Sequence, residues 1–390
     1  MKRNIIFTTI LAVLLAAAPI RGQNGPDNDA DVAPGLTNSV FESGRVDSVN
    51  LYNGQLTVPI PLGPSYPIGP KLRMQLVLSY NSRVDDYGHP TTQSPDYFYK
   101  PLVGNPALPI GWELTAGAIK TCKHGNTTAN CYFSPDGSQH MFNKTQGNGK
   151  VPGDGSQFFL KGTGPYDMWD GDGNHYVFGW SVTGFDDSLT SYTHDFGIGR
   201  NGYYLSSVTD PFGNSYTASY YTSISTPNWV PTSNTCNSAW PMQNPTQTNT
   251  WILKDITLPS GSTVHVNQGP VNGVNGMITS VNFPEFVDGA SATKTWTLVY
   301  NAAPLSYTRF CASPNNITVP LQTLQQVQLP SDLAGSPKYQ FLYASNGLLD
   351  QLTLPTAGTI SYCWTSTPSF TGAPERTNQV AGTSPRRTPL

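Results

Sequence analysis

Residues 205–221 carry the clearest alternation of apolar and polar side chains in the chain, in the sequence LSSVTDPFGNSYTASYY. Near its end, Tyr216, Ala218 and Tyr220 would share one side of an extended strand, and the Ser and Thr residues between them would share the other. Before this strand stands Asp-Pro-Phe-Gly, in which Pro suits the second position of a turn and Gly suits its exit. The pattern predicts a β-hairpin with one buried face and one solvated face.

The same arrangement returns in units that begin at Leu253, Leu324 and Leu349. Each unit has an aliphatic residue three positions after the Leu, a Pro three positions later, and then an alternating strand. The spacing between units is uneven, whereas a solenoid or propeller would repeat evenly. We therefore predict an array of antiparallel hairpins joined by loops of varied length. The residues expected at the hairpin tips are Pro211, Gly213, Pro259, Gly261, Pro330, Pro355 and Gly358.

The first half of the chain also has turn residues between apolar or alternating runs. An Asn-Gly pair at 53–54 lies between apolar runs, which is a strong hairpin signal. Residues 72–80 alternate in the same way as a half-buried strand. Two further turn sequences, at 135–137 and 170–173, lie between short apolar runs. The expected fold class is all-β, an array of antiparallel hairpins preceded by a small β-rich region.

Composition supports a neutral, turn-rich surface. Charged residues make up 12% of the 390 residues, about half of the roughly 25% found in typical soluble domains. The formal net charge is −3 and no basic cluster occurs, which argues against a nucleic-acid footprint or binding to an anionic membrane surface. The 37 Gly and 34 Pro residues suit a chain with many hairpin turns.

Residues 1–22 have the pattern of a signal peptide. Lys2 and Arg3 precede an apolar run over residues 5–20, and small residues follow. We expect the mature chain to be secreted or surface-bound, passing through the periplasm, with no stable membrane span. Residues 23–36 are expected to form a polar leader.

Five cysteines accompany this expected export to an oxidising compartment. Cys122 and Cys131 flank a short polar turn, so they are the favoured disulfide pair. The pairing of Cys236, Cys311 and Cys363 stays open. Metal binding by the cysteines lacks the Cys and His spacing of a zinc site.

Three runs of sequence resemble the N-terminal region of bacterial RHS/YD-repeat proteins: VNLYNGQLTVPIPLG at 49–63, LVLSYNS at 76–82 and PIGWEL at 109–114. With the later hairpins, the resemblance covers about residues 37–364. It implies a large secreted or surface protein whose hairpins coil into a hollow shell. In many relatives that shell encloses a C-terminal toxin domain, and related repeats have been proposed to bind carbohydrate.

The resemblance suggests an N-terminal β region over 37–120 and hairpin repeats over 121–364. Residues 365–390 are polar and aperiodic and are expected to be a disordered tail. The chain contains no recognisable self-cleavage motif or toxin domain of the family. We therefore expect a fragment or truncated product, whose partners would be downstream repeats or a toxin domain.

One candidate metal site is visible in the sequence. Asp170, Asp172 and Asn174 occupy the first three ligand positions of a calcium loop. His175 and Ser181 stand where that loop needs Gly and Glu. A tight strand connection is the favoured interpretation, and no cofactor is expected.

A long polar stretch over residues 222–250 holds Trp229 and Trp240. Exposed indoles on a neutral loop could stack on sugars, or they could fold back over the hairpins as core. Core packing is favoured, with sugar stacking as the alternative. Cell-surface glycans are accordingly a second candidate partner.

No catalytic motif was found. The six histidines are scattered without an HExxH pair, and no GxSxG sequence is present. The adjacent carboxylates at 85–86 and 186–187 look like solvated turns. The leading hypothesis is a non-enzymatic secreted β-scaffold, part of a shell in bacterial interaction or toxin delivery. The alternative is an extracellular carbohydrate-binding or carbohydrate-active protein.

Overall fold

The structure is a computed structural model, and all structural statements concern the residues that it describes. These are 41–43, 46–50, 56–82, 85–88, 98–101, 107–109, 111–124, 127–183, 201–222, 250–287, 290–302, 305–309, 317–333, 335–344, 347–366 and 383–387. Their regular structure is entirely β-strand, and every strand pair is antiparallel. None of these residues belongs to a helix long and apolar enough to cross a membrane. The prediction of an all-β array of antiparallel hairpins is confirmed.

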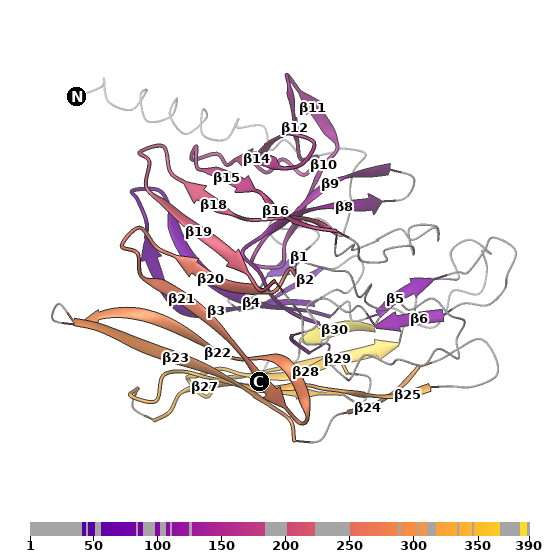
Figure 1. Ribbon diagram of the computed structural model, residues 1–390. Coiled ribbons are helices and arrows are strands. Elements are labelled where there is room, and N and C mark those ends of the chain that lie inside the picture. The colour runs from indigo at the N-terminus through magenta and orange to yellow at the C-terminus, as the bar shows by residue number, and fades with distance from the viewer. Residues whose placement is uncertain are drawn as a thin grey trace, which may run out of the picture.

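Two five-stranded sheets are built from strands within residues 41–204 (Figure 1). The N-terminal sheet has the order β1 (Phe41–Ser43), β2 (Ser48–Asn50), β3 (Leu56–Pro67), β4 (Arg73–Asn81) and β7 (Trp112–Leu114). The second has the order β10 (Gln139–Phe142), β9 (Thr127–Phe133), β8 (Ala118–His124), β17 (Gly202–Tyr204) and β16 (Trp180–Val182).

A sixteen-stranded sheet forms the rest of the main body, and its strands follow one another in chain order. Its first half contains β11 (Lys144–Gln146), β12 (Gly149–Val151), β13 (Phe159–Lys161), β14 (Tyr166–Trp169), β15 (His175–Phe178), β18 (Ser207–Thr209), β19 (Ser215–Tyr220) and β20 (Leu253–Thr257). Its second half contains β21 (Thr263–Val271), β22 (Val274–Val287), β23 (Ala290–Tyr300), β26 (Leu324–Gln328), β27 (Lys338–Tyr343), β28 (Leu349–Thr353), β29 (Thr359–Ser366) and β30 (Thr383–Arg387). Two separate hairpins, β5 (Asp85–Gly88) with β6 (Phe98–Pro101) and β24 (Leu305–Arg309) with β25 (Ile317–Leu321), complete the described strands.

The hairpin tips share one backbone design. In five-residue tips such as 210–214 and 258–262, the first N–H donates to the fifth carbonyl, and the fourth N–H donates to the first carbonyl. The fourth residue has a positive φ, 88° at Gly213 and 81° at Gly261. This is the geometry of a type I turn followed by a left-handed residue, which explains why Pro and Gly mark these tips.

The tip between β28 and β29 has the same hydrogen bonds with a different residue in the left-handed position. At the tip of β28 and β29, Ala357 adopts the left-handed conformation with φ of 66°. Gly358 is the fifth residue of this tip, where its carbonyl accepts the N–H of Leu354. Gly358 therefore lies within the tip, and Ala357 takes the left-handed position.

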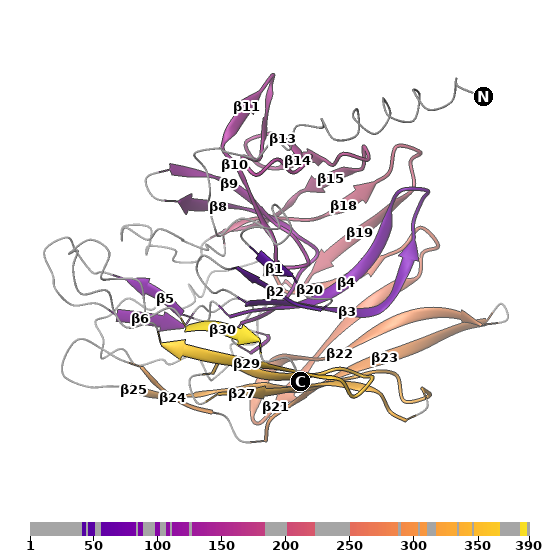
Figure 2. The same ribbon diagram turned by 180° about the vertical axis from the view of Figure 1, so that it is seen from behind.

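The N-terminal sheet packs on one face of the sixteen-stranded sheet. The Tyr66 hydroxyl donates to the carbonyl of Pro284 at 2.7 Å, and Leu349 N–H donates to the Tyr80 hydroxyl at 2.9 Å. Strands from both sheets contribute to one continuous hydrophobic core. Figures 1 and 2 show β3 and β4 crossing beside β19 to β21 from both sides. Trp112 of β7 extends this packing by contacting Phe341 and Tyr343 of β27.

Several predictions fall outside the described residues. They are the signal peptide at 1–22, the polar leader at 23–36, Trp229, Trp240, Cys236 and Cys311. The side chain of Cys363 is likewise not described. Within the expected tail at 365–390, residues 383–387 pair with β29 as β30, so this short stretch is a strand.

Candidate functional site

The tip between β9 and β10 is built by the sequence Ser134-Pro-Asp-Gly-Ser138. Asp136 Oδ1 accepts the N–H of Ser138 at 3.0 Å and a hydrogen bond from the Ser134 hydroxyl. Gly137 supplies the left-handed residue with φ of 86°. A Cβ at this position would lie 3.2 Å from Thr57 Cγ2, so the tip packs closely on the N-terminal sheet.

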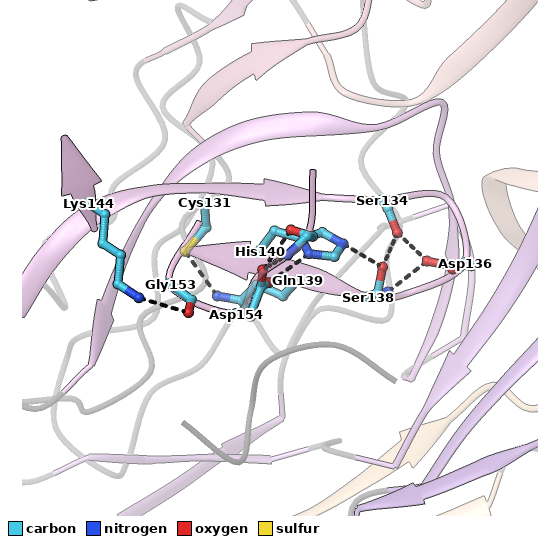
Figure 3. A network of polar contacts seen from close by, with 10 residues as sticks. Cys131, Ser134, Asp136, Ser138, Gln139, His140, Lys144, Gly153 and Asp154 are labelled. Carbon is cyan, nitrogen blue, oxygen red and sulfur yellow. Dashed lines mark hydrogen bonds and ion pairs between the residues drawn. The ribbon is translucent and has the colours of Figure 1, made fainter. Parts of the chain in front are cut away.

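A row of polar contacts runs inward from this tip (Figure 3). Ser138 Oγ lies 3.2 Å from His140 Nε2, and His140 Nδ1 lies 2.8 Å from Asp154 Oδ2. Asp154 Oδ1 accepts the N–H of Ser156 at 2.8 Å and its hydroxyl at 2.6 Å. The row therefore ties the β9–β10 tip to the connection between β12 and β13.

Electrostatics keep Asp154 ionised. Burial raises the pKa of its carboxyl, but hydrogen bonds from His140 and Ser156 outweigh burial and leave the pKa below its ordinary value. The ring of Tyr132 stacks on His140, and the ring of Phe158 meets it edge-on at 4.9 Å between centroids. The imidazole of His140 is thus packed between the rings of Tyr132 and Phe158, and its Nδ1 faces the Asp154 carboxylate.

The order Ser138, His140, Asp154 matches the order of groups that activates a serine nucleophile. The Ser138 hydroxyl is too enclosed for a substrate to reach it, which argues against a nucleophilic role. Ser138 is only 5% exposed, and its hydroxyl also contacts Ser134 Oγ. The N–H groups of Gly137 and Ser138 donate within the tip, so they are not directed at a substrate oxyanion. These features favour a structural network.

Sequence reasoning did not single out these residues. Ser138 and His140 are two positions apart, and a strand places such residues on one face. Asp154 comes from the connection after β12, and its approach depends on how that connection folds back onto β10. Only the spacing of Ser138 and His140 was a usable signal.

Asp170, Asp172 and Asn174, the candidate calcium ligands, lie in the turn between β14 and β15. Asp170 Oδ1 accepts the N–H groups of Asp172 and Asn174, and Asp170 Oδ2 accepts from the Asn174 amide at 2.8 Å and the Tyr176 hydroxyl at 3.0 Å. Asp172 forms an ion pair with Lys71 at 3.1 Å. Asn174 Oδ1 is buried without a described partner, but one amide oxygen is far short of a calcium ligand set.

The turn at Asp210 repeats this arrangement. Asp210 Oδ1 accepts the N–H groups of Phe212 and Asn214, and Asp210 Oδ2 accepts from the Asn214 amide at 2.9 Å. Two sequences of the form Asp-x-x-Gly-Asn thus fold identically. Across the described part of the chain, no three His, Cys, Asp or Glu side chains gather as a metal-ligand cluster.

Cys122 and Cys131 form a disulfide across β8 and β9, with 5.8 Å between their Cα atoms. This is the pair that the sequence favoured. Cys131 is fully buried, and its Sγ accepts a hydrogen bond from the Gln139 amide at 3.3 Å. The disulfide lies beside the polar row and holds the strand that carries the tip.

Comparisons with known proteins give weak likenesses only. No protein-family model matches the sequence, and no curated protein matches it. Among solved structures, TcdB2-TccC3-Cdc42 has a TM-score of 0.39 at 11% identity over 75% of this chain, and TcdB2-TccC3-TEV has 0.40 at 12% over 83%. The aligned regions are 16% and 17% of those chains, so this chain spans about a sixth of their length.

The N-terminal domain of the effector protein SpvB from Salmonella typhimurium strain LT2 has a TM-score of 0.35 at 12% identity. The match covers 69% of this chain and 97% of that domain.

Proposed function

We propose that this chain is a non-enzymatic β-scaffold, exported to the cell surface or the medium, and part of a larger RHS-type shell in bacterial interaction or toxin delivery. Its partner would be a longer protein that supplies further hairpin repeats or a toxin domain. The export step rests on the signal-peptide pattern of residues 1–22. The shell role rests on the architecture of the hairpin array.

The observation that carries the proposal is the sixteen-stranded sheet built in chain order. Each hairpin pairs with the one before it, so further strands can be added at an edge without rearranging the others. The tips that join β18 to β19, β20 to β21 and β28 to β29 lie on the same rim, because the strands between them alternate in direction. A sheet with this regular order of strands can form the wall of a larger shell.

The buried polar groups also support a structural role. The Asp170 and Asp210 carboxylates are occupied by turn hydrogen bonds. The Ser138 hydroxyl lies under the tip that packs on the N-terminal sheet. These groups, which would otherwise be candidates for chemistry, stabilise hairpins.

Fractionation of the producing cells tests the proposal. We expect the chain in the surface or extracellular fraction, shortened at its N-terminus, and in an assembly larger than one chain by size-exclusion chromatography with light scattering. A variant that lacks residues 1–22 is the matched control and should stay inside the cell.

Two results would overturn the proposal. One is a wild-type chain that remains inside the cell as a monomer. The other is glycan binding on an array that Trp229→Ala or Trp240→Ala abolishes, since it would favour the carbohydrate-binding alternative.

A further inference from the structure

The hairpin of β22 and β23 extends beyond the strands on either side of it (Figures 1 and 2). On one side, β21 pairs with β22 only up to Asn282. On the other side, the pairing of β26 with β23 begins at Thr297. Residues 283–296 therefore form a two-stranded arm, the β22–β23 arm. Each of its two strands has an outer edge with which no described strand pairs.

The direction of the backbone groups in the β22–β23 arm follows from one proline. The ladder between the two strands has no register shift, and Pro284 lies opposite Thr293 in it. Proline has no N–H, so these two residues cannot exchange a pair of hydrogen bonds. Hydrogen-bonded and non-hydrogen-bonded pairs alternate along an antiparallel ladder. The N–H and C=O groups of Ser291, Thr293 and Thr295 therefore point away from β22.

The outer edge of β22 is protected against further pairing. By the same alternation, Pro284 faces this edge, where it offers no N–H, and its carbonyl accepts the Tyr66 hydroxyl at 2.7 Å. Beyond its short pairing with β2, β3 likewise carries Pro59 and Pro61. Proline on an edge strand is one of the devices that keep sheets from joining edge to edge.

The outer edge of β23 lacks this device. The sequence from Ser291 to Thr295 contains no proline, and the side chains of Thr293 and Thr295 are exposed. Its single charged residue is Lys294, whose Nζ forms an ion pair with Glu285 of β22 at 3.2 Å. Among the described residues, no backbone group pairs with the outward groups of Ser291, Thr293 and Thr295. Three N–H donors and three C=O acceptors are thus available along this edge.

We propose that the edge of β23 from Ser291 to Thr295 joins two copies of this chain by antiparallel pairing of β23 with β23. Antiparallel pairing of a strand with itself is two-fold symmetric, so both copies use the same surface. A two-fold axis at Thr293 places Ser291 of each copy opposite Thr295 of the other. Every outward N–H then meets an outward C=O of the second copy.

The side chains are compatible with this register. Thr293 lies opposite its counterpart, and Thr–Thr pairs across antiparallel strands are favourable. Ala292 of each copy lies opposite Lys294 of the other, so no like charges face each other directly. Thr297, the first residue that β26 covers, lies outside the five paired positions. The proposed contact therefore uses only backbone groups that the fold leaves available.

Hydrogen exchange of the purified full chain, read by NMR over a concentration series, tests the proposal. The amides of Ala292 and Lys294 point towards β22 and should exchange slowly at every concentration. The amides of Thr293 and Thr295 should exchange fast in dilute solution. They should become protected at high concentration, where light scattering should report dimers. A chain that remains monomeric throughout the series would overturn the proposal, as would dimers in which Thr293 and Thr295 still exchange fast.

Thr293→Pro provides the second arm of the test. It removes the central outward N–H and leaves the ladder to β22 intact, because that N–H points away from β22. Each dimer would lose one hydrogen bond per copy, so the dissociation constant of the dimer should rise about tenfold or more. Thr293→Ser is the matched control, since it retains both the N–H and the hydroxyl, and it should dimerise like the wild type.

A Thr293→Pro protein that dimerises like the wild type would overturn the proposal. The exchange pattern of the wild-type chain remains decisive if that variant does not fold. The purified chain carries no longer partner protein, so the outcome is independent of export and of the larger shell. A monomeric chain would therefore refute the β23 contact and leave the proposed function standing.

Discussion

The indole nitrogen of Trp112 donates a hydrogen bond to the hydroxyl oxygen of Tyr343, 2.8 Å away and 231 positions later in the chain. Trp112 lies in β7 of the N-terminal sheet, and Tyr343 ends β27 of the sixteen-stranded sheet. The indole also packs against Tyr80 at 5.2 Å and against Phe341 at 4.7 Å between ring centroids. This cluster makes the N-terminal sheet an integral part of the hairpin array.

Trp112→Phe should destabilise the protein by about 1–3 kcal/mol, because it retains an aromatic ring but removes the indole hydrogen bond to the Tyr343 hydroxyl. Trp112→Ala should cost more, about 3–5 kcal/mol, because it also leaves a cavity. Urea denaturation followed by circular dichroism measures both. Trp169→Phe is the control, since Trp169 is partly exposed. Equal losses at positions 112 and 169 would contradict the role of the cluster.

Gly213→Ala and Ala357→Gly should change stability in opposite directions. Both positions have positive φ, 88° and 66°, where a Cβ costs roughly 1 kcal/mol. A Cβ on Gly213 would meet no atom within 4 Å, so its effect is that of the backbone alone. Thermal melts should show a lower midpoint for Gly213→Ala and a higher one for Ala357→Gly. Shifts of the same sign would refute the shared tip geometry.

Gly69→Ala should weaken docking of the β3–β4 hairpin. A Cβ at position 69 would lie 1.8 Å from Asp210 Oδ2, so the carboxylate that organises the β18–β19 tip would have to move. Hydrogen exchange should become faster in both β3–β4 and the 210–214 tip. Gly358→Ala has only ordinary contacts at 3.8 Å and should leave exchange unchanged. Unaltered exchange in Gly69→Ala would contradict this contact.

The buried tyrosines predict a loss of stability in alkali. Burial raises the pKa of Tyr80, Tyr216 and Tyr300, and burial together with nearby Glu285 raises the pKa of Tyr66 to about 12. Because each folded pKa lies above the unfolded value near 10, this stability is complete below about pH 10 and is lost as the pH rises towards the folded values. Ultraviolet absorbance of tyrosinate should rise together with unfolding. Full tyrosine ionisation before unfolding would show that the hydroxyls are accessible.

Local signals predicted the hairpin tips well because turn chemistry acts over five residues. Pro211 and Gly213 mark a tip whose geometry needs one fixed φ and one positive φ, and the structure places both as expected. At the β28–β29 tip, Gly358 is the fifth residue and Ala357 is the left-handed one. Backbone hydrogen bonds, rather than residue preference, selected that position.

The sequence by itself determined the all-β class, the order of the hairpins and the favoured Cys122–Cys131 pair, because alternation, turn residues and short spacing are local properties. It did not determine what packs on Phe341 and Tyr343 or which polar groups meet His140. Both depend on contacts between segments far apart in the chain, such as Trp112 with Tyr343, and only the packing of the two sheets brings these together.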